Sequence, residues 1–353
     1  ALQAHKLGIP VAIYCASKDE PAAQVAGDWQ RGSLGDERAL RKFLEHCSVV
    51  TFESEFMDAA RLARLSTEIG TKVYPSPGLM GALQDRLTQK MLLERHKLPT
   101  AHFHNVKDEQ AARIAFSHFG GQVVFKKRRF GYDGYGTFVV QNEKELTRFL
   151  PHVATEENGF ICEEFVPFKR EVAVIATRSQ DGSSIRYPFV ETFQENSRCL
   201  WVRGPLAPNE KLSKLGREID RFLRDIDYVG TIGIELFETK NGYIVNELAP
   251  RVHNSGHYTQ DAMTLDQFSA HIQAVSGLPL AKPQLRSGGF AMMNLIGATD
   301  REPSWEVPPD VHFHWYGKSE NRVGRKMGHY NVLSTTPARA LAIAKRRRSA
   351  FKV

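Results

Sequence analysis

The stretch TIGIELFETKNGYIVNEL, residues 231–248, decides the fold of this chain. Two apolar segments flank a short polar turn that contains Asn241-Gly242, which is the pattern of a β-hairpin. Each apolar segment contains one glutamate, Glu235 in the first and Glu247 in the second. Burying a carboxylate is costly unless a cation or a hydrogen-bond donor compensates its charge. The hairpin therefore predicts a place where two carboxylates serve a function.

The length of the turn decides whether these glutamates face each other. A two-residue turn at Asn241-Gly242 would set Glu235 and Glu247 on opposite faces, whereas a three-residue loop from Lys240 to Gly242 would set them opposite each other. Facing carboxylates repel unless a cation lies between them, and Mg²⁺ commonly bridges carboxylates and nucleotide phosphates. We therefore predict that Glu235 and Glu247 bind Mg²⁺ or Mn²⁺. The alternative is one exposed glutamate on each face of the hairpin.

A second segment, VFKKRRFGYDGYG at 124–136, joins an expected strand to a glycine-rich loop. Lys126 lies at the end of the strand, where its charge could attract phosphates, and glycines let backbone N–H groups approach a polyanion closely. The segment has no GK[ST] sequence, and no helix clearly follows it, so neither of the two common nucleotide-binding fingerprints fits. Phosphate binding and a flexible basic hairpin loop both remain open from this pattern alone.

The run NELAPRVHNSGH at 246–257 follows the hairpin directly and is dense in polar residues. Arg251 can clamp a phosphate with two donors. His253 and His257 have no accompanying third or fourth ligand of the zinc type, so we expect hydrogen-bonding roles for them. A structural role and a functional role for His257 are equally compatible with the sequence.

The whole chain has the composition of an ordinary soluble protein. Its 353 residues suggest two or three domains, and no apolar stretch is long enough to predict a membrane span or a signal peptide. The four cysteines form no CxxC pair, which favours buried free thiols and a cytoplasmic setting. The net charge is +7, in part from basic residues at 345–352, which we interpret as a solvated tail and not as a nucleic-acid site.

Hydrophobic spacing predicts the organisation of the chain. Short strands alternate with helices in the first part, which argues for a parallel sheet. Ala1 lies in what reads as the middle of a helix, so we expect a first strand and its turn to precede it. Further along we expect one helix from Ala82 to Lys97, ended by Pro99, and another over about 259–275.

Three motifs together resemble the N5-carboxyaminoimidazole ribonucleotide synthetase family of ATP-grasp enzymes. They are the run at 246–257, the loop FGYDGYG at 130–136 and the segment HWYGK at 314–318, and the resemblance extends from about residue 5 to about residue 333. It implies that ATP, bicarbonate and 5-aminoimidazole ribonucleotide react to N5-carboxyaminoimidazole ribonucleotide, ADP and phosphate. The reaction would pass through carboxyphosphate and belong to de novo purine biosynthesis.

The resemblance also implies an α/β fold of three domains. A Rossmann-like pre-ATP-grasp domain with a parallel sheet would span residues 1–80, and an ATP-grasp domain would span 81–276 with a mobile lid at about 100–165. A small β-rich C-terminal domain would span 277–353. A homodimer is implied as well, and we expect neither nucleic acid nor a membrane as a partner.

Residue roles follow from the resemblance, position by position. The residues implied for ATP are Lys90, Lys126, Glu163, Glu164, Phe165, Val166, Glu171 and Asn246. Those implied for the ribonucleotide are Glu53, Tyr132, Asp133, Arg251, His253, Asn254, Lys318 and Arg325. The implied magnesium ligands are Glu235 and Glu247, and the implied catalytic residues are Arg251, His253 and Lys126.

The chain departs from the family pattern in three places. It starts after the family's first strand and GxGQLG turn, Tyr135 stands where the family usually has arginine or lysine, and the part after Pro337 is unlike the family's ending. Two alternatives stay open: another ATP-grasp ligase, such as the formate-using glycinamide ribonucleotide transformylase, or a catalytically silent nucleotide-binding or nucleic-acid-binding protein.

Overall fold

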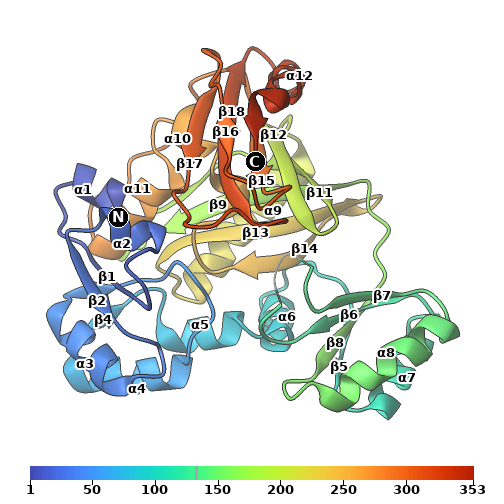
Figure 1. Ribbon diagram of the computed structural model, residues 1–353. Coiled ribbons are helices and arrows are strands. Elements are labelled where there is room, and N and C mark those ends of the chain that lie inside the picture. Colours follow the sequence, from blue (N-terminus) through green and yellow to red (C-terminus); the bar gives the residue numbers. More distant parts are fainter. Residues whose placement is uncertain (132–133) are drawn as a thin grey trace.

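The computed structural model describes residues 1–131 and 134–353 of the chain (Figure 1). Two residues implied for the ribonucleotide, Tyr132 and Asp133, lie outside the described residues. Among the helices of the described part, none is long and apolar enough to cross a membrane.

The N-terminal region, blue in Figure 1, alternates strands and helices as expected. Its elements are α1 (Leu2–Lys6), β1 (Ala12–Cys15), α2 (Pro21–Val25), β2 (Asp28–Arg31), α3 (Glu37–His46), β3 (Val49–Val50), α4 (Ala59–Ile69) and β4 (Lys72–Val73). β1 pairs with β2 and β3 pairs with β4, both in parallel. The parallel pairing is therefore confirmed, but it occurs as two short pairs and not as one hydrogen-bonded sheet.

The prediction of a single helix from Ala82 to Lys97 is wrong, because the chain forms two helices in this region. α5 spans Pro77–Leu83, and α6 spans Arg86–Arg95. Between them, the Asp85 carboxylate accepts a hydrogen bond from the backbone N–H of Leu87 at 3.0 Å and so caps a new helix. The apolar spacing continues through this cap, which is why the break is hard to see in the sequence.

A compact unit of four strands and two helices follows, at the lower right of Figure 1. It contains β5 (Phe103–Val106), α7 (Glu109–His118), β6 (Val123–Lys127), β7 (Thr137–Val140), α8 (Glu143–Thr155) and β8 (Phe160–Glu164). The antiparallel strands have the order β5-β8-β6-β7, and the two helices pack on this sheet over a shared apolar core. This unit covers most of the expected lid at about 100–165, and we refer to it as the lid.

The rest of the chain is built on one large antiparallel sheet with the order β14-β13-β9-β11-β12-β15-β18-β17. Its strands are β9 (Arg170–Arg178), β11 (Val190–Glu195), β12 (Arg198–Gly204), β13 (Gly230–Thr239), β14 (Gly242–Ala249), β15 (Gly289–Ile296), β17 (His312–Trp315) and β18 (Lys326–Ser334). Short β10 (Ser184–Arg186) pairs with β9, and β16 (Ser304–Trp305) pairs with β19 (Phe351–Lys352). The strands β15, β17 and β18 thus continue the sheet that β9 to β14 begin.

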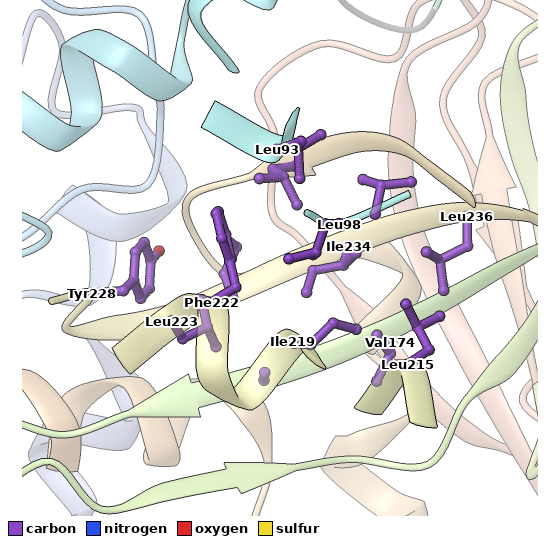
Figure 2. Close-up of a cluster of buried hydrophobic side chains, with 14 of the residues drawn as sticks. Leu93, Leu98, Val174, Leu215, Ile219, Phe222, Leu223, Tyr228, Ile234 and Leu236 are labelled. Atoms are coloured by element: carbon purple, nitrogen blue, oxygen red, sulfur yellow. The ribbon is translucent and has the colours of Figure 1, made fainter. Parts of the chain in front are cut away.

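Helix α9 (Glu210–Asp225) covers one face of this sheet. Its buried residues Leu215, Ile219 and Phe222 pack against Ile234 and Leu236 of β13 (Figure 2). Truncating a buried phenylalanine such as Phe222 to alanine costs roughly 3–5 kcal/mol. This packing fixes β13, the strand that contains Glu235.

Two further expectations are wrong in detail. The helix expected over 259–275 is divided into α10 (Thr259–Ala262) and α11 (Gln267–Ser276), because Asp266 caps α11 by accepting from the N–H groups of Phe268 and Ser269. The basic side chains near the C-terminus, Lys345 to Arg347, are exposed as expected, but they do not form a tail. They end α12 (Pro337–Arg347), whose residues Ala340, Leu341 and Ala344 are buried beside β15 and β18.

Candidate active site

The hairpin β13–β14 sets Glu235 directly opposite Glu247, as predicted. The route differs from the expected three-residue loop. Thr239 pairs with Gly242, so that the turn is Lys240-Asn241, and a β-bulge later places both Asn246 and Glu247 opposite Glu235. Because a bulge adds one residue to one strand, it restores the register that the shorter turn would have shifted.

Glu235 and Glu247 form the acidic part of the site. The Arg86 guanidinium donates to both carboxylate oxygens of Glu247 at 3.1 Å, and the Nε2 of His253 lies 3.6 Å from a carboxylate oxygen of Glu235. Burial, together with the charges of Glu247 and Glu171, raises the pKa of Glu235 to about 7. A cation between these carboxylates would relieve both effects.

The donor set fits a hard divalent cation that is completed by other ligands. Carboxylate oxygens suit Mg²⁺, which usually takes one or two carboxylates together with phosphates and water. Within residues 1–131 and 134–353, no group of three or more histidines, cysteines or acidic residues is arranged to hold a metal ion by itself. A cation at Glu235 and Glu247 would therefore share its remaining positions with a bound phosphate chain.

A buried charge cluster lies where the lid meets the large sheet. The Glu163 carboxylate lies 2.9 Å from the Nζ of Lys126 and 3.5 Å from the Nζ of Lys90. Lys126 also donates to the side chain of Asn246 at 3.0 Å, and Lys90 donates to the hydroxyl of Thr100 at 2.7 Å. Burial, together with the neighbouring Lys126 charge, lowers the pKa of Lys90 to about 8. The two lysines predicted for ATP phosphates are thus brought together, with Glu163 holding them in place.

The segment after Glu163 connects the lid sheet to the large sheet. The Glu164 carboxylate accepts from the backbone N–H of His102 at 2.9 Å, and Phe165 is exposed. Glu171 follows on β9, where one of its carboxylate oxygens is buried without a hydrogen-bond partner among the described residues. Burial raises the pKa of Glu171 to about 7. A ligand hydroxyl could satisfy that oxygen, in keeping with the predicted ribose contact.

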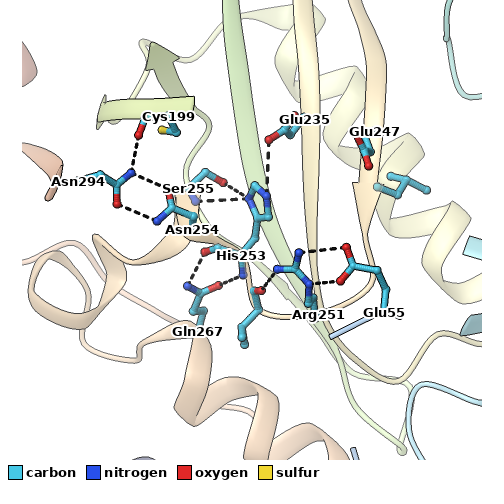
Figure 3. A network of polar contacts seen from close by, with 12 residues as sticks. Glu55, Cys199, Glu235, Glu247, Arg251, His253, Asn254, Ser255, Gln267 and Asn294 are labelled. Atoms are coloured by element: carbon cyan, nitrogen blue, oxygen red, sulfur yellow. Dashed lines mark hydrogen bonds and ion pairs between the residues drawn. The ribbon is translucent and has the colours of Figure 1, made fainter. Parts of the chain in front are cut away.

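Arg251 and His253 lie beside Glu235 and Glu247 (Figure 3). The guanidinium of Arg251 forms a two-pronged ion pair with Glu55, with one of the hydrogen bonds at 3.1 Å. Gln267 clamps the backbone of His253, because its side chain accepts from the N–H of His253 at 2.9 Å and donates to the carbonyl at 2.8 Å. The Nδ1 of His253 lies 2.8 Å from the hydroxyl of Ser255, and burial holds the pKa of His253 well below its usual range.

The close approach of His253 to β13 depends on Gly233. A Cβ atom added at Gly233 would lie 2.4 Å from the Cβ of His253. The strand therefore needs glycine at this position for the imidazole ring to reach Glu235.

The predicted ribonucleotide residues are distributed around this centre. Lys318 donates to the carbonyl of Lys326 at 2.6 Å, and Arg325 donates to the carbonyl of Glu320 at 3.0 Å. Asn254 exchanges hydrogen bonds with Asn294 at 2.9 and 2.7 Å. Glu53 is exposed, and its neighbour Glu55 is the carboxylate that contacts Arg251.

Sequence reasoning missed an arginine–aspartate network at the base of the glycine-rich loop. Arg86 contacts Glu247, and it also donates to the carbonyl of Lys127 at 3.1 Å. The buried Asp85 accepts from Arg128 at 3.0 and 2.6 Å and from Arg129 at 3.4 Å. An aspartate followed by a helix is a cap signal that could have located Asp85, but its long-range arginine partners carry no local pattern.

Tyr135 stands where the family usually has arginine or lysine, and its ring lies against the ammonium group of Lys127 on β6. The Nζ of Lys127 is 5.0 Å from the centroid of the Tyr135 ring, and it also lies 2.7 Å from a carboxylate oxygen of Glu156. The loop is therefore held at this point by an aromatic ring and an ion pair.

Two small hollows open onto the site. The first is lined by Glu55, Phe56, Leu83, Gln84, Arg86, Gln89, Phe130, Gly131, Glu247, Leu248 and Pro250. The second is lined by Thr192, Gln194, Cys199, Glu235, His253, Asn254, Ser255 and Lys326. They border Glu247 and Glu235 respectively, so each carboxylate of the facing pair has its own opening.

Comparison with known protein families gives a consistent result along the chain. A family model described as the ATP-grasp domain matches residues 91–268. The ribonucleotide synthetase preATP-grasp domain matches residues 1–84, and the phosphoribosylaminoimidazole carboxylase C-terminal domain matches residues 291–343.

Individual relatives agree with these matches. The N5-carboxyaminoimidazole ribonucleotide synthase of Synechococcus elongatus is 37% identical over 93% of this chain and 85% of its own length. The N5-carboxyaminoimidazole synthetase of Staphylococcus aureus, solved with ADP, has a TM-score of 0.89 at 29% identity and covers 98% of this chain and 92% of that one. The Aspergillus clavatus enzyme, solved with ADP and 5-aminoimidazole ribonucleotide, has a TM-score of 0.88 at 26% identity and covers 99% and 94%. The chain therefore belongs to the N5-carboxyaminoimidazole ribonucleotide synthase family of ATP-grasp enzymes.

Proposed function

We infer that this protein catalyses the ATP-dependent carboxylation of 5-aminoimidazole ribonucleotide with bicarbonate in purine biosynthesis. The single observation that carries this inference is the facing pair Glu235 and Glu247 beside the buried lysines Lys90 and Lys126. The family relationship over 93% of the chain supports the choice of substrates.

Bicarbonate is a poor electrophile, and phosphorylation gives its carbon a good leaving group. In the first step an oxygen of bicarbonate attacks the γ-phosphorus of ATP. The bond from this phosphorus to the β–γ bridging oxygen breaks, and ADP leaves with the electron pair. Lys90 and Lys126 hold the phosphates as point charges. Mg²⁺ held by Glu235 and Glu247 would neutralise charge on the phosphate oxygens.

In the second step the amine of the ribonucleotide attacks the carbon of carboxyphosphate. The bond from this carbon to the phosphate oxygen breaks, and the proton lost by the amine ends on the released phosphate. His253 is neutral near pH 7, because its pKa is lowered by burial, so it contributes hydrogen bonds and not a positive charge. Ser255 and Gln267 fix its orientation, and Glu55 fixes that of Arg251 beside it. Closure of the lid over ATP would exclude water, which otherwise hydrolyses the intermediate.

The deciding experiment measures ADP release with and without 5-aminoimidazole ribonucleotide, and identifies the product with bicarbonate or formate as the one-carbon source. We expect ADP release that depends on the ribonucleotide and on bicarbonate. Turnover with formate and glycinamide ribonucleotide would overturn this function in favour of another ATP-grasp ligase. Salt-dependent DNA binding without stimulated ATP hydrolysis would favour the silent alternative.

The remaining expectations belong to the same proposal. We propose a homodimer, a cytoplasmic location and a requirement for Mg²⁺, with Mn²⁺ as a substitute. Sedimentation of the purified protein tests the first, and titration of either metal into metal-free protein tests the last.

A further inference from the structure

The second hollow contains a cation that the steps above do not use. It lies between β11, β12, β13 and the loop after β14, and Lys326 closes it from the start of β18. Lys318 and Arg325, which are predicted to bind the ribonucleotide phosphate, are not among its lining residues. The cation in this hollow is therefore distinct from the two that are predicted to bind that phosphate.

Lys326 contributes its backbone and its side chain to different parts of the site. Its carbonyl accepts the hydrogen bond from Lys318 at 2.6 Å, whereas its side chain lines the hollow. The charge of Lys326 favours the ionised form of Glu235 and disfavours protonation of His253, so the field of the ammonium group reaches both side chains. Lys326 and Glu235 also line the same hollow, so the cation lies near one of the predicted metal ligands.

The hollow is also lined by small polar side chains that are held by hydrogen bonds. Asn254 is locked to Asn294, which also donates to the carbonyl of Cys199 at 2.8 Å. The hydroxyl of Ser255 is fixed against the Nδ1 of His253 at 2.8 Å. Thr192 of β11, which is almost fully buried, also lines the hollow. Hydroxyl and amide side chains around one lysine suit a small planar oxyanion.

We propose that Lys326 and Thr192 bind bicarbonate in this hollow and keep hold of its carboxyl end after phosphorylation. The inference rests on the proposed function, because it assigns a position to one of its substrates. An oxyanion held between Lys326 and His253 lies beside Glu235, so its free oxygen can approach a phosphate chain shared with the metal. Lys318 and Arg325 lie on the segment that leads into β18, so the ribonucleotide would approach from the same side as Lys326.

The test compares Michaelis constants for the three substrates in buffers freed of dissolved CO₂. We expect Lys326→Met to raise the KM for bicarbonate by about tenfold or more, because a charge-assisted hydrogen bond is lost, while the KM for ATP changes little. Lys326→Arg, which keeps the charge, should recover part of the loss. Lys282→Met, which removes an exposed lysine from the linker before β15, is the matched control and should behave as wild type.

Thr192→Val tests the hollow independently, since it replaces a hydroxyl by a methyl group of similar size. We expect it to raise the KM for bicarbonate by roughly three- to tenfold, as for a lost hydrogen bond to a charged group. Because this change is nearly isosteric, it remains informative if Lys326→Met does not fold. Melting temperatures of all variants report on folding separately from activity.

Three outcomes would overturn the assignment. An unchanged KM for bicarbonate in both Lys326→Met and Thr192→Val would remove the subsite and leave the proposed function intact. A raised KM for the ribonucleotide alone would assign Lys326 to that substrate instead. A wild-type protein without bicarbonate-dependent ADP release would overturn the function itself, together with this subsite.

Discussion

At the scale of single residues, the carboxyl of Glu235 combines burial with two carboxylate neighbours. Its pKa is raised from 4.5 to about 7, so the folded protein keeps a proton on Glu235 in a range where the unfolded chain has lost it. The stability that this proton contributes is fully present below about pH 4.5 and is lost as the pH rises to about 7.

Glu235→Gln removes this titration. Without Mg²⁺, wild type should lose stability between pH 5 and pH 8 and the variant should not. The difference in free energy of unfolding, variant minus wild type, should therefore increase by roughly 1–2 kcal/mol over this pH range. This energy is discounted for the partial exposure of the side chain. Urea unfolding at the two pH values measures the difference. Parallel pH profiles for the two proteins would show that Glu235 has no raised pKa.

Glu247→Gln keeps a hydrogen-bond acceptor for Arg86 but removes the charge needed by a cation. We expect ATP turnover to fall by about a thousandfold or more, as for loss of a metal ligand, with a melting temperature close to that of wild type. Mg²⁺ together with ADP should raise the melting temperature of wild type and not of the variant. Glu195→Gln, an exposed glutamate at the end of β11, is the control and should respond as wild type does. Full activity in Glu247→Gln would rule out the metal role.

The residue scale also shows what the sequence could and could not predict. Glu235, Glu247 and Lys126 stood out because charged residues within apolar strands or at a strand end are visible locally. Lys90 lies within a helix and was implied only by the family resemblance. Asp85 and Glu55 did not stand out, because their partners Arg128 and Arg251 are distant in the chain or belong to another element. Long-range ion pairs leave no periodic signal, so the structure was needed to find them.

At the scale of elements, strand β13 connects the carboxylate pair to His253 through Gly233. In Gly233→Ala the new methyl group would overlap His253, which is clamped by Gln267 and cannot swing away. We expect activity to drop at least tenfold, with a stability loss of roughly 1–3 kcal/mol from overpacking. Steady-state kinetics and thermal melting provide both measurements.

Gly78→Ala is the matched control, because this glycine lies in α5 with open space around it. Alanine favours helix over glycine by roughly 0.5–1 kcal/mol, so this variant should be as active as wild type and at least as stable. Equal effects of the two substitutions would contradict the proposed crowding at His253.

Asp85 caps helix α6, and it also binds Arg128 and Arg129 at the base of the glycine-rich loop. Asp85→Ala should cost about 1–2 kcal/mol for the lost cap, and it should also raise the KM for ATP because Arg128 and Arg129 are released. The carboxylate of Asp108 caps α7 by accepting from the N–H of Ala111. Asp108→Ala removes this cap only, and so is the control. An equal rise of the KM for ATP in both variants would show that the effect is only one of stability.

Prediction from sequence succeeded better for elements than for their boundaries. The hairpin register of Glu235 and Glu247 was predicted correctly, although the expected loop was one residue too long and the bulge at Asn246 was not foreseen. The bulge leaves no strong signature in this sequence, whereas a strand pair is visible as two apolar segments. Helices were merged at Asp85 and Asp266, because apolar spacing continues across both caps.

At the scale of the whole molecule, the lid is a compact unit with its own core, joined to the rest by short connections. We expect a nucleotide to link it to the large sheet through Lys126 on β6 and Lys90 on α6. Amide hydrogen exchange should slow in β6 and β8 when ADP and Mg²⁺ are added, and it should remain unchanged in β15. Equal protection of both regions would argue for general stabilisation and against closure of the lid.

The long sheet from β14 to β17 has a further mechanical consequence. Glu235 on β13 and Lys326 on β18 belong to one hydrogen-bonded sheet, and the strand pairing between them limits changes in their separation. We therefore expect the distance between these two side chains to change little when substrates bind. In the proposed reaction, closure of the lid would therefore bring ATP to two reactants whose spacing the sheet has already set.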